Sequence, residues 1–181
     1  KTMIAAAMNP CKCGFFPDLG KCRCTPTQIR RYLNRVSGPF LDRIDIGVEV
    51  PRQDLGMMAA EKSIDEGSFP QTEQRNSSAV MRARVMEARA RQEKRFADES
   101  ISYNSQMTRR QIEEYCRLSG EDVVFLEKVE RQQGISARGH GKILKVARTL
   151  ADLDGQAEIG RTQLAEAIGF RSFEKKYWGS L

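Results

Sequence analysis

Four of the five cysteines lie between residues 11 and 24, and this cluster constrains the fold more than any other feature of the sequence. They form two Cys-x-Cys pairs, Cys11 with Cys13 and Cys22 with Cys24, on the arms of a loop that contains Gly and Pro. A Cys-x-Cys pair closes poorly on itself, because a disulfide needs particular Cα separations and side-chain directions. Four thiolates on two arms can instead surround zinc tetrahedrally. We therefore expect a closed, structural zinc site, with free or redox-labile thiols and disulfides as the alternatives.

The remaining composition is that of a globular chain. The sequence has 181 residues, 40% of them hydrophobic, which is enough to bury a core. It contains no run of about 18 apolar residues, so we expect no membrane-spanning helix. The fifth cysteine, Cys116, is expected to be a buried, inert thiol on an amphipathic helix. A net charge of +6 favours contact with polyanions, although on its own it indicates little.

Residues 1–51 have the pattern of α/β pieces. Strands are predicted at 2–8 and 44–50, where short apolar runs occur. A helix is predicted from Pro26 to Arg35, because Thr25 can cap it and Pro26 is favourable in a first helical turn. The apolar start of the chain is too short for the hydrophobic region of a signal peptide, which favours the strand.

Residues 52–76 are polar and rich in turn formers, which predicts a linker. Residues 77–181 are helical in pattern and predict a small α-bundle. Its helices are expected at Ser77–Phe96, after the caps Thr108 and Ser119, from Ser136 to about Asp152, and at Thr162–Ile168. The predicted fold class is therefore α+β, with a cysteine-rich loop in its first part and an all-α second part.

No complete catalytic motif is present in the sequence. The segment Gly139–Ile143 lacks the spacing of a phosphate-binding loop, and the apolar run at Val123–Glu127 lies inside a capped helix rather than a strand. The single histidine, His140, excludes a histidine-based zinc protease site. This chain on its own is therefore not expected to be an enzyme.

Several segments nevertheless occur in a familiar order: an apolar run that ends at Asn9-Pro10, the cysteine loop, Leu41-Asp42-Arg43-Ile44-Asp45 and Ser136-Ala137-Arg138-Gly139. In this order the chain resembles the second half of an AAA+ ATPase of the magnesium-chelatase-like kind, most closely the competence-type branch, often called ComM or YifB. The resemblance covers nearly the whole chain apart from 52–75. It implies the C-terminal piece of an α/β ATPase core followed by a helical lid, in a cytoplasmic protein that uses ATP with Mg²⁺. Walker A and Walker B are absent from these residues.

The resemblance also implies roles for three residues. Asn9 matches sensor 1, Arg43 the arginine finger that reaches the next subunit, and Arg138 sensor 2, so that Asn9 and Arg138 would contact the nucleotide. These residue types suit the roles, because an amide both donates and accepts hydrogen bonds and a guanidinium fork fits phosphate oxygens. The alternatives are a turn-starting Asn-Pro, an ion pair of Arg43 with a neighbouring aspartate, and an ordinary surface arginine.

Competence-type members are implied to form homo-oligomeric rings, hexamers in particular, that remodel DNA by branch migration. The predicted helix at 77–96 carries basic residues that could follow a phosphate backbone, or could simply form a solvated face: Arg82, Arg84, Arg89, Arg91, Lys94 and Arg95. Two other functions stay open. One is the same ATPase acting on metal insertion or on a protein client, and the other is a stand-alone zinc-bearing DNA-binding module.

Overall fold

The computed structural model describes residues 3–50 and 77–179. The chain divides into two compact units: unit 1 combines Lys1–Gly47 with Phe170–Leu181, and unit 2 is Val48–Gly169. No helix within the described ranges is both long and apolar enough to cross a bilayer.

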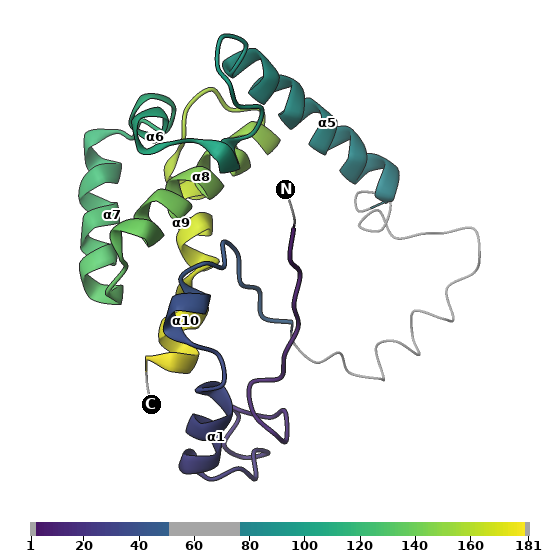
Figure 1. The fold of residues 1–181 in the computed structure, drawn as a ribbon, viewed down its shortest axis with the longest axis vertical. Helices are drawn as coiled ribbons and strands as arrows, with labels where there is room; N and C mark the ends of the chain where they lie inside the picture. The colour runs from purple at the N-terminus through teal and green to yellow at the C-terminus, as the bar shows by residue number, and fades with distance from the viewer. Residues whose placement is uncertain (1–2, 51–76, 180–181) are drawn as a thin grey trace. The chain divides into compact units, whose positions relative to one another are not determined.

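The predicted α+β class is wrong, because residues 3–50 and 77–179 contain helices but no strand (Figure 1). The segments predicted as strands, 2–8 and 44–50, have no regular secondary structure over the residues described. A strand is stable only when its backbone pairs along a neighbouring strand, and the described residues form no such ladder with these segments. Their apolar side chains are accordingly exposed, including Met3 at 91% and Val50 at 87%.

Unit 1 is built from three short helices and the cysteine loop. α1 spans Pro26–Leu33, α2 spans Gly38–Leu41 and α10 spans Ser172–Trp178. The predicted start of α1 is confirmed, since Thr25 and Gln28 form a reciprocal capping box and Pro26 lies in the first turn. α10 closes the unit from the far end of the chain, because the indole Nε1 of Trp178 donates to the Leu33 carbonyl at 3.1 Å.

In the described part of unit 2, residues 77–169 form a helical bundle, and the five helices predicted there are confirmed. They are α5 (Ser78–Arg95), α6 (Arg109–Tyr115), α7 (Gly120–Gln133), α8 (Ala137–Leu153) and α9 (Arg161–Gly169). The structure adds the 3₁₀ turn η1 (Asn104–Gln106). The hydroxyls of four caps each accept a backbone N–H from the first turn: Ser77, Thr108, Ser119 and Ser136. Gly134 ends α7 with a φ of 69°, a conformation that favours glycine.

α8 is the central helix of unit 2 and packs against α5, α6, η1 and α9 (Figure 1). Its apolar stripe includes Ile143, Ala147 and Ala151, each with no exposed surface. Leu126 of α7 and Leu164 of α9 complete the same core. The amphipathic pattern of α8 therefore determines how the bundle assembles.

A buried polar network fixes α5 to the C-terminal end of α8. The Asp152 carboxylate is fully buried, accepts hydrogen bonds from both Nη atoms of Arg95, and lies 3.1 Å from Nη2 of Arg148. Asn104 of η1 adds a hydrogen bond of 2.8 Å through Nδ2. Burial alone would raise the pKa of Asp152, but the hydrogen bonds from Arg95 and Asn104 outweigh it and lower that pKa.

Candidate functional site

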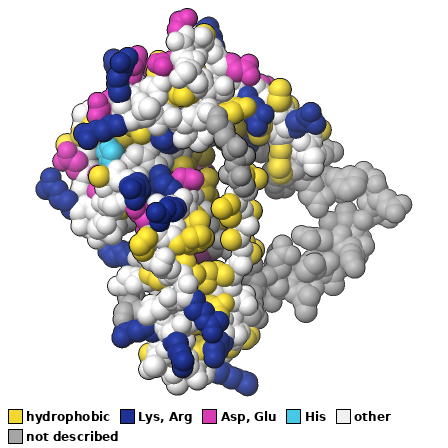
Figure 2. Space-filling model, viewed as in Figure 1, with side chains coloured by type: hydrophobic (Ala, Val, Ile, Leu, Met, Phe, Trp, Pro, Cys, Tyr) yellow, Lys and Arg dark blue, Asp and Glu magenta, His cyan; other side chains and the backbone are white. Residues whose placement is uncertain are grey.

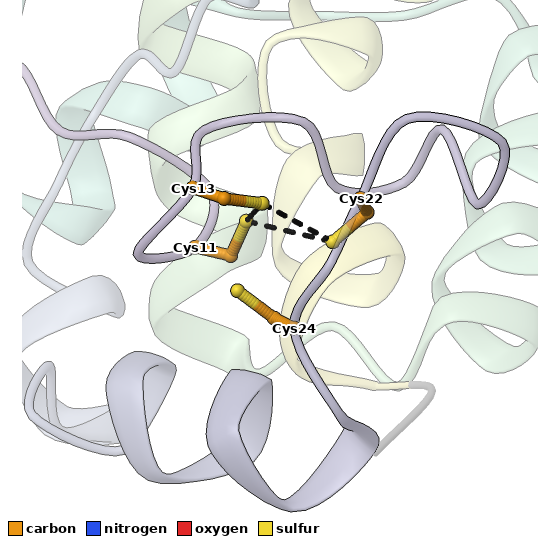
Figure 3. A group of neighbouring side chains, drawn as sticks. All are labelled: Cys11, Cys13, Cys22 and Cys24. Carbon is orange, nitrogen blue, oxygen red and sulfur yellow. Dashed lines mark hydrogen bonds between the residues drawn. The ribbon is translucent and has the colours of Figure 1, made fainter.

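The four clustered cysteines point toward one another from the two arms of the loop (Figure 3). The Sγ atom of Cys11 lies 3.4 Å from that of Cys13 and 3.8 Å from that of Cys22, and the Cys13 and Cys22 sulfurs are 3.5 Å apart. All four Sγ atoms, including that of Cys24, lie within 4.8 Å of one another. All four are free thiols rather than disulfides.

Local backbone interactions bring the two arms of the loop together. Gly14 turns the chain after the first pair with a φ of 77°, and the amide of Cys22 donates to the Asp18 carbonyl at 2.8 Å before the second pair. α1 begins directly after Cys24 and supplies Ile29 to a small core around Cys11. These contacts are short-range in the sequence.

The thiols of the cluster differ in pKa because their surroundings differ. Hydrogen bonds from the backbone of Phe15 and Arg23 lower the pKa of Cys13 to about 6. The backbone of Cys24 lowers the pKa of Cys22, but burial and the thiols of Cys13 and Cys11 outweigh it and raise that pKa to about 12. Four sulfurs this close cannot all carry charge unless a cation compensates them, and metal binding would release the remaining protons.

The donor set fits zinc. A tetrahedral ion with Zn–S bonds of about 2.3 Å places neighbouring sulfurs about 3.8 Å apart. The sulfur separations among Cys11, Cys13 and Cys22, which are 3.4, 3.5 and 3.8 Å, are close to that edge length. Cys11 is fully buried, and the amide of Phe16 lies 3.5 Å from its sulfur as a supporting donor. Four thiolates fill a tetrahedron, so such a site would be structural rather than catalytic.

Two of the residues predicted to act on a nucleotide lie in unit 1. Asn9 is exposed and follows the apolar segment directly. Arg43 follows α2 and is also exposed, with its Nη1 donating to the Pro39 carbonyl at 2.6 Å. The backbone around Arg43 is held by a succession of turns, in which the Arg43 amide donates to the Phe40 carbonyl and the Ile44 amide to the Leu41 carbonyl.

The third, Arg138, lies in unit 2 as the second residue of α8, and it is exposed. Its helix is capped by Ser136, whose hydroxyl accepts the Gly139 amide at 3.0 Å. A helix N-terminus favours anions, because its first amides lack intrahelical partners and the helix dipole adds positive potential there. The position is compatible with phosphate recognition, and the role of Arg138 stays a prediction.

The six basic residues predicted to contact DNA are not equivalent in the structure. Two of them bind Asp152 within unit 2, since Arg95 pairs with its buried carboxylate and Arg91 donates through Nη1 to its carbonyl at 2.9 Å. Arg84 lies 3.8 Å from the partly exposed carboxylate of Asp154. The side chain of Arg89 lies over the ring of Tyr103, 5.5 Å from its centroid. The exposed ones are Arg82, Arg84, Arg89 and Lys94.

The N-terminal half of α5 presents a mixed surface. Figure 2 shows basic side chains interspersed with hydrophobic ones over this helix. Four hydrophobic residues there are 40–55% exposed: Val80, Met81, Val85 and Met86. α5 is thus anchored by its C-terminal half and exposes both charge and apolar surface on the other half.

α10 was not among the predicted helices, although the sequence carries a signal for it. Phe170, Phe173, Tyr177 and Trp178 follow the i, i+3, i+7, i+8 spacing of one helix face. Tyr177 and Trp178 pack against the cysteine core, and the Tyr177 ring meets the Phe16 ring edge-on with centroids 6.0 Å apart. Arg171, immediately before this helix, is 5% exposed, and sequence reasoning did not single it out.

Comparison with known protein families gives two matches along the chain. Residues 1–58 match the family described as magnesium chelatase, subunit ChlI. Residues 75–171 match the family described as magnesium chelatase, subunit ChlI C-terminal. The first match includes Asn9, the four cysteines and Arg43, and the second includes α5 and Arg138.

The chain is also similar to several curated proteins over most of its length. It is 39% identical over 170 residues to the competence protein ComM of Haemophilus influenzae, covering 93% of this chain and 30% of that protein. It is 39% identical over 172 residues to YifB of Escherichia coli, an uncharacterized protein, covering 95% of this chain and 31% of YifB. The uncharacterized protein Mb2921c of Mycobacterium bovis is 30% identical over 168 residues, which are 93% of this chain and 31% of that protein. The chain thus spans less than a third of the length of these relatives.

Proposed function

The chain belongs to the magnesium chelatase ChlI family, and on that basis we propose that it is the C-terminal part of an AAA+ ATPase of the competence type, working as a homo-oligomeric ring on DNA. The observation that carries the proposal is the order of the two family matches. The first match contains Asn9 and Arg43 and the second contains Arg138. The resemblance to AAA+ proteins assigns these three residues to nucleotide sensing and to the arginine finger.

The proposed site uses this chain's residues on both sides of a subunit boundary. Asn9 orients the attacking water and a phosphate oxygen, because its amide both donates and accepts. Arg43 acts on the nucleotide of the neighbouring subunit, where its planar fork meets the charge that spreads over the transferred phosphoryl oxygens. Arg138 contributes positive charge at the N-terminus of α8. Mg²⁺ bound with ATP would neutralise charge on the phosphates.

The four cysteines hold a structural Zn²⁺ in this proposal. Support comes from the sulfur separations, which suit tetrahedral zinc, and from the absence of any disulfide among the cysteines. Metal analysis of untagged protein purified under reducing conditions is expected to find about one zinc per chain. Cys22→Ser should lower that content, whereas the matched control Cys116→Ala should not, because Cys116 is buried in unit 2. Metal-free wild-type protein would contradict the site.

DNA is the proposed client, as the resemblance to competence-type members implies, and the exposed basic residues of α5 support it. The exposed residues on α5 that suit a phosphate backbone are Arg82, Arg84, Arg89 and Lys94. Arg91 and Arg95 serve the fold instead, because both bind Asp152. The hypothesis of DNA contact is therefore limited to these four exposed residues of the six that the sequence predicted.

The decisive experiment is ATP hydrolysis by the protein joined to the ATPase half that the proposal requires, with and without branched or linear DNA. Stimulation by DNA is the expected result. Turnover indifferent to DNA would favour metal insertion or a protein client, and absence of turnover would favour a zinc-bearing binding module.

Two variants test the residue roles in the same assay. Arg43→Ala should abolish turnover and leave ATP binding intact, because a finger acts on the neighbouring subunit's nucleotide. Arg138→Ala should weaken both binding and turnover, because its side chain contacts the nucleotide of its own subunit. Normal hydrolysis by Arg43→Ala would refute the finger assignment.

A further inference from the structure

α10 lies against the segment that carries Arg43, although more than a hundred residues separate them in the sequence. Both belong to unit 1. The contact begins just before α10, where the Gly47 amide donates to the Phe170 carbonyl at 2.9 Å. A Cβ atom at position 47 would clash with the ring of Phe173. The two segments can approach this closely because residue 47 is glycine.

Arg171 connects α10 to both neighbours of Arg43. Its Nη1 donates to the Ile44 carbonyl at 2.8 Å, and its Nη2 lies 3.9 Å from Oδ1 of Asp42. The same guanidinium pairs with Glu174 of α10. The residue before Arg43 and the residue after it are therefore tied to one buried side chain.

The burial of Arg171 makes these contacts specific. The residue is only 5% exposed, and a buried guanidinium is tolerated when carbonyls and carboxylates satisfy its donors. The planar guanidinium of Arg171 meets a carbonyl on one side and carboxylates on the other, so its contacts have defined directions. The backbone from Asp42 to Ile44 is thus fixed in relation to α10, while Arg43 itself faces solvent and contacts the Pro39 carbonyl.

We propose that Arg171 is a positioning residue for Arg43: it fixes the backbone on both sides of the finger so that the guanidinium of Arg43 is directed out of unit 1 toward a neighbouring subunit. The inference rests on the proposed function, since it needs Arg43 to act in trans. Positioning matters for such a residue, because a displacement of about 1 Å at a reacting group can cost on the order of 100-fold in rate.

The test uses the longer ATPase form with the variants Arg171→Ala and Arg171→Lys, and with Arg31→Ala as a matched control on the exposed face of α1. Arg171→Ala should lower kcat by roughly 10- to 100-fold and leave the Kd for ATP unchanged, since the finger does not bind the nucleotide of its own subunit. Arg171→Lys keeps the charge without the fork and should fall between Arg171→Ala and wild type. Arg31→Ala should behave as wild type.

Mixed rings separate positioning from a general structural role. Arg171→Ala subunits mixed with Asn9→Ala subunits should regain turnover, because the intact finger of one acts on the intact nucleotide site of the other. Mixtures of Arg171→Ala with Arg43→Ala should not regain it, because both lack a working finger. Recovery in the second mixture, or its absence in the first, would overturn the inference.

The same data distinguish failure of the inference from failure of the proposed function. If Arg43→Ala is inactive while Arg171→Ala is fully active, only the inference fails. If Arg43→Ala is fully active, the finger assignment itself fails. Should Arg171→Ala not fold, Asp42→Asn removes one charged contact of Arg171 and must reduce kcat without changing the Kd for ATP; unchanged kcat would count against positioning.

Discussion

Replacing Asp152 by alanine should destabilise unit 2 more than any surface change near it. The carboxylate is fully buried between Arg95 of α5, Arg148 of α8 and Asn104 of η1. Its removal leaves Arg148, whose side chain is 2% exposed, without a carboxylate partner in the network. Breaking a buried ion pair by removing one partner costs about 3–5 kcal/mol. For a bundle of this size that corresponds to a fall in Tm of roughly 12–40 °C.

Thermal unfolding followed by circular dichroism checks the magnitude, with Asp154→Ala as the matched control. Asp154 lies two residues further along and pairs with Arg84 at 3.8 Å, but its side chain is 42% exposed. An exposed pair contributes about 0–1 kcal/mol, so this variant should melt within a few degrees of wild type. If Asp152→Ala also stays within about 1 kcal/mol of wild type, the network does not hold α5 to α8, and the reasoning fails.

Three further predictions concern Asp152, Cys116 and the exposed basic residues of α5. Burial raises the pKa of Asp152, but hydrogen bonds from Arg95 outweigh burial, so the pKa in the folded chain lies below the ordinary value of 3.8. The ionised carboxylate therefore stabilises the folded chain at pH values above 3.8, and this contribution is lost as the pH falls through the folded pKa. Thermal melts of wild type should lose stability more steeply in acid than melts of Asp152→Asn, and parallel curves would refute this. Burial raises the pKa of Cys116 to about 11, so iodoacetamide should leave Cys116 unlabelled in native protein at pH 8 and label it only in denaturant, as read by mass spectrometry. The double variant Arg82→Ala/Lys94→Ala should weaken DNA binding and flatten its salt dependence in fluorescence anisotropy titrations, and an unchanged salt slope would remove α5 from the interface.

The helices of unit 2 could be predicted because their signals are local. A hydroxyl at the cap, its partner three residues later and an apolar stripe at helical spacing all lie within a single helix. Ser119 and Gly134 therefore indicated where α7 begins and ends, Ser136 indicated where α8 begins, and the structure confirms those positions. The cysteine loop was predictable for the same reason, because the two Cys-x-Cys pairs lie close together in the sequence on either side of a turn.

The strands could not be predicted correctly from the same kind of pattern. An apolar run such as 2–8 indicates a strand only if another segment pairs with it, and pairing is a property of the whole chain rather than of the run. The position of α10 was equally non-local: its aromatic spacing indicates a helix, but nothing in that spacing shows that Arg171 meets Ile44 and Asp42. Sequence reasoning thus found the proposed finger, Arg43, and missed the residue that contacts its neighbours.

Metal removal should unfold unit 1 selectively, because its core is small and centred on the thiols. Trp178 is the single tryptophan of the chain and packs against the core that contains Cys11, so its fluorescence reports on this unit alone. Zinc binding to small sites is coupled to folding, and chelation should therefore shift the Trp178 emission to longer wavelength. Most of the helical circular dichroism should persist, since α5, α7 and α8, with 18, 14 and 17 residues, belong to unit 2. Cys22→Ser should reproduce the shift and Cys116→Ala should not; an unchanged emission spectrum after complete zinc removal would show that unit 1 folds without the metal.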